Sequence, residues 1–426
     1  MKLADMDKSQ LQAMKADLEK QYGEFKARGL KLNMARGKPA SAQLDLSMGL
    51  LTALDGVSMK DADGADVRNY GGLNGIPEAR ALFGEIFGMP ADQVIIGGSA
   101  SLNLMYDTIS RAFLHGVLPN STPWSKVEGI KFLCPAPGYD RHFSICETFG
   151  IEMIPIELKA DGPDMDVVEK LLASDDKIKG MWCVPMYSNP DGVTYSDAVV
   201  KRLAAMKPAA KDFRIFWDNA YCLHHLDRNN RDYLYNIYEA CKANGNEDRV
   251  YMFASTSKIT FAGGGISAMS ASVANIKFTS AQMNIQTISY DKVNQLRHCK
   301  FFPNLAAVEA HMDKHAAIMK PKFEMVIAWL EKEIAPLDIA HWHNPKGGYF
   351  VSFYALDGTA KRVVGLCKEG GVVLTGAGAT YPYGKDPHDS NIRIAPSLPP
   401  VAELEQAMEL FCIAVKLASV EKLLEN

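Results

Sequence analysis

The sequence predicts an α/β protein, with a mostly parallel, doubly wound sheet in a large domain and a smaller α+β domain after it. Short apolar runs alternate with helical stretches over about 170 residues, which favours such a sheet. Several of these runs are continuously apolar, as expected for strands that helices cover on both faces. After about residue 305 the pattern changes to one long helical stretch followed by short strand-like runs.

Seven apolar runs are expected to be the strands of the large sheet. Because strands and helices alternate along this part of the chain, most neighbouring strands should run parallel. The seven runs cover residues 94–96, 130–133, 151–156, 181–184, 214–217, 250–254 and 266–270.

The same patterns predict how the chain is divided. Residues 1–45 are expected to form an N-terminal helix and arm that belong with the small domain. Residues 46–305 should form the large domain, and residues 306–426 the small C-terminal domain. The first helix should cover residues 9–28, because apolar residues recur there at spacings of three and four and Ser9 can serve as its N-cap.

Composition excludes several classes of protein. The chain has 426 residues, 47% hydrophobic and 23% charged, which is ordinary for a globular protein. Its net charge of −4 argues against a general nucleic-acid binder. No apolar stretch reaches the ~18 residues of a membrane span, and the charged N-terminus lacks the core of a signal peptide. The eight cysteines are scattered without a C-x-x-C pair, so we expect reduced thiols and a cytoplasmic protein.

The residues after the expected strands are the first place to look for function, because open α/β sheets bind ligands at the carboxyl ends of their strands. The first strand is followed by Gly97, Gly98, Ser99, Ala100 and Ser101, and then by a helical run. Free backbone N–H groups and the helix dipole at such a turn suit a phosphate group. The same residues also make an ordinary glycine-rich turn, so alone they do not establish a phosphate site.

Two further strand ends supply an aromatic ring and an amide. Tyr139 ends a loop stiffened by two prolines and can stack on a flat heterocycle, although a loop tyrosine can equally pack into a core. Asn189 precedes Pro190, which favours an extended backbone and lets the amide point into a cleft. An Asn-Pro pair also occurs in plain turns.

The last two strand ends supply an acid and an amine. Asp218 ends an apolar strand, where it is either a helix N-cap or the counter-ion of a buried cation, and Tyr221 follows it. Lys258 comes after Ser255 and Ser257. A desolvated lysine becomes a nucleophile toward carbonyls, whereas most loop lysines are simply solvated. Each feature is weak alone, but five of them in this order, each after an expected strand, are improbable by chance.

The ordered set resembles the fold-type I pyridoxal-phosphate (PLP) enzymes, specifically the aspartate aminotransferase superfamily. The resemblance extends from about Asn33 to Ser397, and residues 69–80 and 218–226 are most similar to the bacterial subgroup Ic enzymes, which are related to MocR regulators. It implies the PLP-dependent transferase fold type I, PLP as cofactor, and ping-pong transfer of an amino group from L-aspartate to 2-oxoglutarate. It also implies a homodimer with shared active sites.

The resemblance gives each residue an expected role. Lys258 bonds to the cofactor and moves the substrate proton, Asp218 pairs with the ring nitrogen, and Tyr221 contacts the ring oxygen. The substrate α-carboxylate is expected at Arg393, with Gly37 and Asn189 beside it. The other implied cofactor contacts are Ser99, Ala100, Ser101, Ser255 and Ser257 at the phosphate, Tyr139 on the ring face, Asn189 at the ring oxygen, and Tyr70 at the phosphate of the neighbouring subunit.

The sequence departs from the family pattern in its cations. Residues 259–296 contain no arginine, where the family places one against the phosphate. Arg297, Lys292 and Arg141 are candidates to replace it. A dicarboxylate substrate also needs a second cation beside Arg393, and Arg36, Arg297 and Arg141 are candidates for that role.

Other functions stay open at this point. One is a different reaction with the same cofactor, catalysed by a broad-specificity aminotransferase or a β-lyase. Another is a MocR-like ligand-sensing domain, but only ~30 residues precede Asn33, too few for a DNA-binding module. No metal site is expected, because the adjacent His224 and His225 point in different directions and no cluster completes a site. His341 and His343 are expected at the surface or at a domain hinge.

Overall fold

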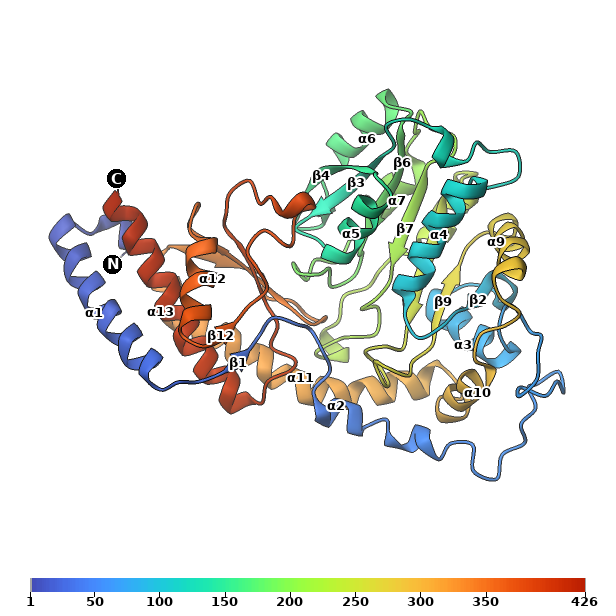
Figure 1. Cartoon of the computed structure of the whole chain (residues 1–426), viewed down its shortest axis with the longest axis horizontal. Helices are drawn as coiled ribbons and strands as arrows, with labels where there is room; N and C mark the ends of the chain where they lie inside the picture. Colours follow the sequence, from blue (N-terminus) through green and yellow to red (C-terminus); the bar gives the residue numbers. More distant parts are fainter. Residues whose placement is uncertain (1, 426) are drawn as a thin grey trace.

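The structure is a computed structural model that describes residues 2–425, and it has two lobes (Figure 1). The larger lobe is built on an eight-stranded sheet, and the smaller lobe on a three-stranded sheet. Helix α11 (Leu305–Glu333) runs from the larger lobe into the smaller one, and both ends of the chain lie at the far end of the smaller lobe.

The large sheet has the strand order β2-β9-β8-β7-β6-β3-β4-β5. Strands β3, β4, β6, β7 and β8 pair in parallel, whereas β9 is antiparallel to both β8 and β2. The predicted fold class is therefore confirmed. The structure adds an eighth strand to the seven predicted, because the two-residue edge strand β5 contains a proline and has no apolar run to reveal it. The strands are β2 Val94–Ile96, β3 Lys131–Ala136, β4 Glu152–Lys159, β5 Gly162–Pro163, β6 Ile178–Cys183, β7 Arg214–Asp218, β8 Val250–Ser255 and β9 Ser267–Ser270.

Helices cover both faces of this sheet. Successive strand residues point to opposite faces, so that Ile215 and Trp217 pack on one side and Phe216 on the other. Helices α4 (Ser101–His115), α5 (Asp140–Thr148) and α9 (Val273–Gln286) pack on the Phe216 face. The opposite face packs against α3 (Pro77–Phe87), α6 (Met165–Ser174), α7 (Asp197–Ala205), α8 (Ile237–Ala243) and α10 (Lys292–Phe301). Burial on both faces explains why the strands read as continuous apolar runs.

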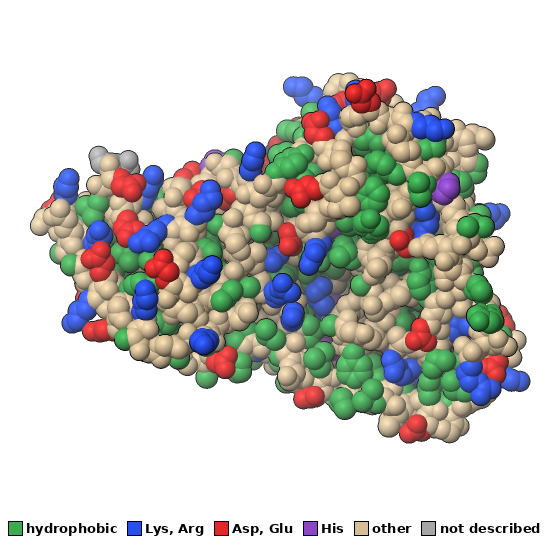
Figure 2. Space-filling view, in the orientation of Figure 1, with side chains coloured by type: hydrophobic (Ala, Val, Ile, Leu, Met, Phe, Trp, Pro, Cys, Tyr) green, Lys and Arg blue, Asp and Glu red, His purple; other side chains and the backbone are tan. Residues whose placement is uncertain are grey.

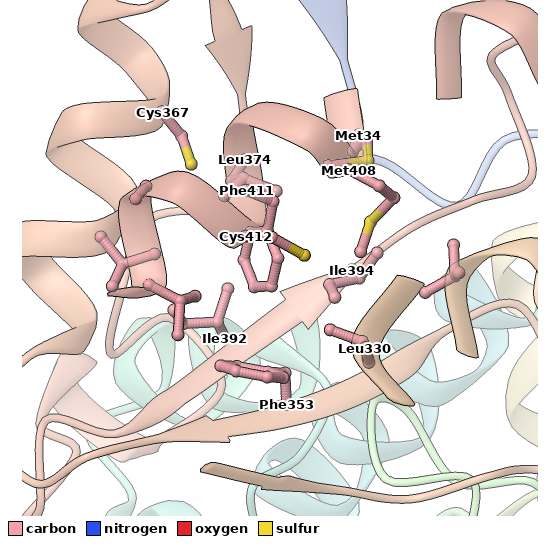
Figure 3. Close-up of a cluster of buried hydrophobic side chains, with 14 of the residues drawn as sticks. Met34, Leu330, Phe353, Cys367, Leu374, Ile392, Ile394, Met408, Phe411 and Cys412 are labelled. Atoms are coloured by element: carbon pink, nitrogen blue, oxygen red, sulfur yellow. The ribbon is translucent and has the colours of Figure 1, made fainter. Parts of the chain in front are cut away.

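The smaller lobe combines the two ends of the chain. Its core includes Phe353, Ile392, Ile394 and Phe411, with Leu330 of α11 beside them (Figure 3). Helix α1 packs along α13, which brings residues from the start of the chain into this core. The proposed division at residues 45/46 and 305/306 stays a prediction, which this packing supports. The remaining elements are α1 Lys8–Ala27, β1 Leu32–Asn33, α2 Ser41–Asp45, β10 Ala340–Trp342, β11 Val351–Ala355, α12 Ala360–Glu369, β12 Val372–Val373, β13 Asn391–Ile394 and α13 Val401–Glu425.

Two short pairings complete the connection of the N-terminal arm to the smaller lobe. Strand β1 runs parallel to β12, with Leu32 opposite Val372. The three-stranded sheet has the order β10-β11-β13 with antiparallel pairs. Among residues 2–425, the structure contains no helix that combines the length and the apolar character of a membrane span.

Candidate active site

The residues predicted to bind a ligand lie at one edge of the large sheet. Ser99, Tyr139, Asn189, Asp218 and Lys258 each end or follow one of the mutually parallel strands β2, β3, β6, β7 and β8. Since β7 and β8 are neighbours in the sheet, Asp218 and Lys258 emerge side by side. In Figure 2, Lys and Arg side chains gather around a hollow between the two lobes.

The predicted phosphate turn is assembled from two strand ends. The hydroxyl of Ser257 donates a hydrogen bond to the carbonyl of Ser99 over 2.9 Å, and the hydroxyls of Ser255 and Ser257 are also 2.9 Å apart. Helix α4 begins at Ser101, and its N-cap Ala100 has no side chain that could accept from the first N–H groups of the helix. These donors and hydroxyls together form a surface suited to an oxyanion.

Asp218 has one satisfied and one free carboxylate oxygen. The residue is 4% exposed, and Oδ2 lies 3.0 Å from Nε2 of His142. The His142 ring stacks on Trp182 with centroids 4.2 Å apart, which fixes its direction. The other oxygen, Oδ1, is buried without a hydrogen-bond partner in the described chain. A buried, unpaired carboxylate oxygen is costly, so this arrangement suits a donor supplied by a ligand.

The side chains of Lys258 and two tyrosines face the same space as Asp218. The Nζ atom of Lys258 lies 5.0 Å from the centre of the Tyr221 ring. Burial raises the pKa of Tyr139 to about 12, against the opposing charge of the nearby Lys258. Burial also raises the pKa of Tyr221. Both phenols therefore stay neutral near pH 7 and keep a proton to donate.

Two buried histidines hold the turn that carries Lys258. His298 on α10 lies 3.0 Å from Oγ1 of Thr260, and burial lowers the pKa of this histidine to about 4. His311 on α11 lies 2.9 Å, through Nε2, from the carbonyl of Ile259. Because α11 also reaches the smaller lobe, the Lys258 turn is attached to the element that joins the lobes.

Arg393 lies on β13 of the smaller lobe and reaches the edge of the large sheet. One guanidinium nitrogen donates to Oδ1 of Asn189 over 3.2 Å, and the other donates to Oγ1 of Thr375 over 3.0 Å. The guanidinium also covers the ring of Phe350 at 4.8 Å from its centroid. Its Nε atom is buried and has no partner in the described chain. A planar cation held in this way can bind a carboxylate through two parallel hydrogen bonds.

Gly37 lies close to the ring of Phe350, which the guanidinium of Arg393 covers. Its segment is linked to Arg393 through Thr375, whose hydroxyl donates to the carbonyl of Ala35 over 2.6 Å. A Cβ atom on Gly37 would lie 2.5 Å from Cζ of Phe350 and 2.8 Å from Cε1. A side chain at position 37 would therefore displace the ring over which the guanidinium of Arg393 lies.

Replacing Gly37 by alanine is expected to destabilise the protein. The Phe350 ring would have to move, and overpacking of this kind lowers the free energy of unfolding by about 1–3 kcal/mol. Urea denaturation measures the change. Gly365→Ala is a matched control, because nothing lies within 4 Å of a Cβ at this position of α12. If Gly37→Ala were as stable as the parent protein, the packing argument would be wrong.

Some of the predicted site residues do not lie with Asp218, Lys258 and Arg393. The Tyr70 side chain is 82% exposed, and its role in a neighbouring subunit stays a prediction. Lys292, a candidate for the phosphate, instead donates a hydrogen bond to the backbone carbonyl of Tyr70 over 3.3 Å. Arg297 lies against the glycine stretch after Lys258, because its NH2 atom is 4.0 Å from the Cβ position of Gly264. The other two candidate cations, Arg36 and Arg141, are exposed.

The side chains of the adjacent histidines point to different partners. The ring of His225 lies 2.8 Å, through Nδ1, from the hydroxyl of Tyr187, whereas His224 packs edge-on against Tyr221 and Tyr349. Within residues 2–425 no three His, Cys, Asp or Glu side chains are grouped as metal ligands.

Comparison with known proteins identifies the family. The family model described as aspartate amino-transferase matches residues 6–426. The chain belongs to this family. An aspartate aminotransferase of Corynebacterium glutamicum is 46% identical over 419 residues, which are 98% of this chain and 96% of that protein.

Solved structures agree with this assignment. The crystal structure of an aspartate transaminase from Corynebacterium glutamicum superimposes on this aminotransferase with a TM-score of 0.96 and covers 99% of both chains at 46% identity. An α-aminoadipate aminotransferase from Thermus thermophilus, complexed with N-(5'-phosphopyridoxyl)-L-leucine, has a TM-score of 0.74 at 18% identity and covers 93% of this chain and 95% of its own. At that identity the second likeness concerns the fold alone. The predicted family and fold type are both confirmed.

Proposed function

We propose that this aminotransferase moves the amino group of L-aspartate to 2-oxoglutarate in two half-reactions, with PLP as its cofactor. The observation that carries the proposal is the pairing at the ends of β7 and β8. A free carboxylate oxygen of Asp218 and the amine of Lys258 face one space, and the guanidinium of Arg393 closes it from the other lobe.

The residues present fit PLP on chemical grounds. The unpartnered Oδ1 of Asp218 would accept a hydrogen bond from the protonated ring nitrogen. The hydroxyls of Ser255 and Ser257 and the first turn of α4 would bind the phosphate. Tyr139 would lie on the ring face, and Tyr221 and Asn189 would donate to the ring oxygen. Arg297 is the cation we propose for the phosphate, because it lies against Gly264, on the stretch that follows Lys258.

Each of the protein's own groups then has a separate role in the reaction. PLP, when bound, supplies an aldehyde that bonds to amines and a ring that takes up the electron pair left by the departing Cα proton. Nζ of Lys258 accepts that proton and returns it, which requires its neutral amine. Arg393 binds the substrate α-carboxylate and fixes the direction of the Cα–H bond. Oδ2 of Asp218 is held by His142, so the direction of Oδ1, which would accept from the ring nitrogen of bound PLP, is fixed.

We also propose that the active sites are shared in a homodimer. Tyr70 is exposed, and the segment that carries it is joined to α9 by a hydrogen bond from Ser280 to Asn74 of 2.8 Å. Exposed apolar side chains, Leu51, Ile285 and Ile288, occur on the neighbouring segments. An unpaired apolar surface of this kind is typical of a subunit contact. Light scattering should give the mass of a dimer, and a monomer in solution would contradict it.

Cytoplasm is the compartment we propose. All eight cysteines are free, and all but Cys222 are buried. Free thiols are typical of proteins in a reducing compartment.

A donor comparison tests the proposed substrate. With 2-oxoglutarate as acceptor, aspartate is expected to give a kcat/KM at least about tenfold above that of alanine, because a second carboxylate gains a charge-assisted hydrogen bond. The measurement is glutamate formation with aspartate, alanine, kynurenine and aromatic amino acids. Equal values for aspartate and alanine would favour a broad-specificity enzyme. Repeated release of pyruvate and ammonia from an amino acid with a β leaving group, such as a cysteine S-conjugate, without an acceptor would favour a β-lyase. Arg36→Gln and Arg141→Gln would show which exposed cation binds the distal carboxylate.

A further inference from the structure

A buried carboxylate with no part in the proposed reaction lies two residues after Asn189. Asp191 belongs to the loop that follows β6, and it is 1% exposed. Burial raises the pKa of this carboxyl group, against the stabilising effect of nearby histidines and hydroxyls. A carboxylate in such a position is costly unless it is well paired, so its partners indicate what it does.

The partners of Asp191 lie on the other lobe. The hydroxyl of Tyr354, on β11, is 2.8 Å from both carboxylate oxygens. Nδ1 of His343 is 2.9 Å from the backbone carbonyl of Asp191. The next residue, Gly192, packs so closely on Pro345 that a Cβ there would lie 2.5 Å from the proline Cβ. The loop of the larger lobe is therefore fixed against the segment leading into β11.

The strand register places this contact beside the substrate arginine. In the antiparallel pair of β11 and β13, Ser352 is opposite Arg393 and Tyr354 is opposite Asn391. Residues two apart along a strand share a face, so Tyr354 and Arg393 lie on the same face of the small sheet. That face meets the loop after β6 at two points, Arg393 with Asn189 and Tyr354 with Asp191.

The ring of Tyr354 is itself held in place. His341, on β10, stacks on it with centroids 4.6 Å apart and planes inclined by 3°. The hydroxyl therefore points to one position, where it meets Asp191. His341 and His343, predicted to lie at the surface or at a hinge, lie at this junction of the lobes.

We propose that Asp191 and Tyr354 form a clasp that sets the distance between Asn189 and Arg393, and that both are positioning residues for binding of the substrate carboxylate. Neither side chain touches the substrate. The clasp aims the guanidinium by holding the two lobes in register, and this part of the proposal rests on the role proposed for Arg393. Loss of the clasp should therefore weaken carboxylate binding without removing Lys258 or Asp218 from the site.

Maleate, a dicarboxylate without an amine, is the probe for the test. Its dissociation constant with the PLP-loaded enzyme, measured by calorimetry, should rise about tenfold in Tyr354→Phe, because a hydrogen bond to a charged group is lost. Asp191→Asn keeps one acceptor for the tyrosine and should have a smaller effect, about threefold. KM for aspartate should rise in parallel, with kcat changed less.

Tyr383→Phe is the matched control. The hydroxyl of Tyr383 also makes a contact between the lobes, accepting a hydrogen bond from the backbone N–H of Met153 over 2.7 Å. Tyr383, however, lies outside the β10-β11-β13 sheet, and its partner is on β4 rather than on the loop after β6. Its removal should leave maleate binding unchanged. Unchanged binding in Tyr354→Phe, or an equal loss in Tyr383→Phe, would overturn the clasp.

A crystal structure of Tyr354→Phe gives a readout that does not depend on activity. The distance between Arg393 and Asn189, now 3.2 Å, should exceed the hydrogen-bond limit of about 3.5 Å. An unchanged distance would refute the clasp even if the variant bound maleate more weakly or had a higher KM for aspartate. Failure of the wild-type enzyme to bind maleate or use aspartate would instead refute the proposed substrate, so the two failures are distinguishable.

Discussion

Replacing Lys258 by alanine is expected to lower kcat by about four orders of magnitude or more, because the variant loses the amine proposed to move the Cα proton. Lys258 is the lysine that lies over the Tyr221 ring, next to the end of the strand that carries Asp218. The initial rate of glutamate formation from aspartate and 2-oxoglutarate gives kcat.

The matched control for this variant is Lys211→Ala. Lys211 is an exposed lysine that precedes β7, at the opposite edge of the large sheet. Its replacement should leave kcat unchanged. Thermal unfolding should show that Lys258→Ala stays folded. A Lys258→Ala protein with more than a few per cent of the wild-type kcat would contradict the role proposed for this amine.

Asp218→Asn is expected to have the second-largest effect. The amide keeps the size of the carboxylate but cannot balance a positive ring nitrogen, and breaking a buried ion pair costs about 3–5 kcal/mol. If that cost falls on the transition state, kcat drops by about two to four orders of magnitude. Asp218→Glu keeps the charge and should retain more activity than Asp218→Asn.

Asp212→Asn is the control for Asp218. Asp212 precedes the same strand, β7, and is paired with Lys179 at 2.7 Å at the other edge of the sheet. Its loss should lower the stability of the protein but leave kcat within about twofold, since it lies far from the site. If the two variants lost the same activity, the effect of Asp218→Asn would be one of folding rather than of chemistry.

The sequence contained most of the information on the fold. Strands buried on both faces are continuous apolar runs, and all seven predicted runs are strands, with bounds that agree with the predicted ones to within three residues. Strand β5 could not be predicted, because two residues form no pattern. The N-cap predicted at Ser9 was wrong: Asp7 caps α1 and forms a capping box with Gln10, so the helix begins at Lys8.

The sequence also located the strand ends that meet at the candidate site, because parallel strands deliver their carboxyl ends to one edge. It did not reveal His142, although the position of this residue in the first turn of the helix that Tyr139 precedes could have suggested it. The sequence did not predict two of the residues that contact Arg393. Phe350 and Thr375 come from other segments of the smaller lobe, and only the folding of that lobe brings them to Arg393.

The same limit explains why Asp191 was overlooked. In the sequence it is one more turn residue after an Asn-Pro pair. The role proposed for Asp191 depends on its contact with Tyr354, which is 163 residues away in the sequence. A contact of that separation depends on how the two lobes meet, which local patterns do not specify.

The central claim is that Lys258 faces a bound PLP, and one measurement tests it directly. The purified protein is incubated with PLP, treated with borohydride to make any lysine–cofactor bond permanent, digested, and mapped by mass spectrometry. We expect one pyridoxyl adduct, on the peptide that contains Lys258, and none on that peptide in Lys258→Ala. An unmodified Lys258 peptide, or an adduct on another lysine alone, would contradict the account.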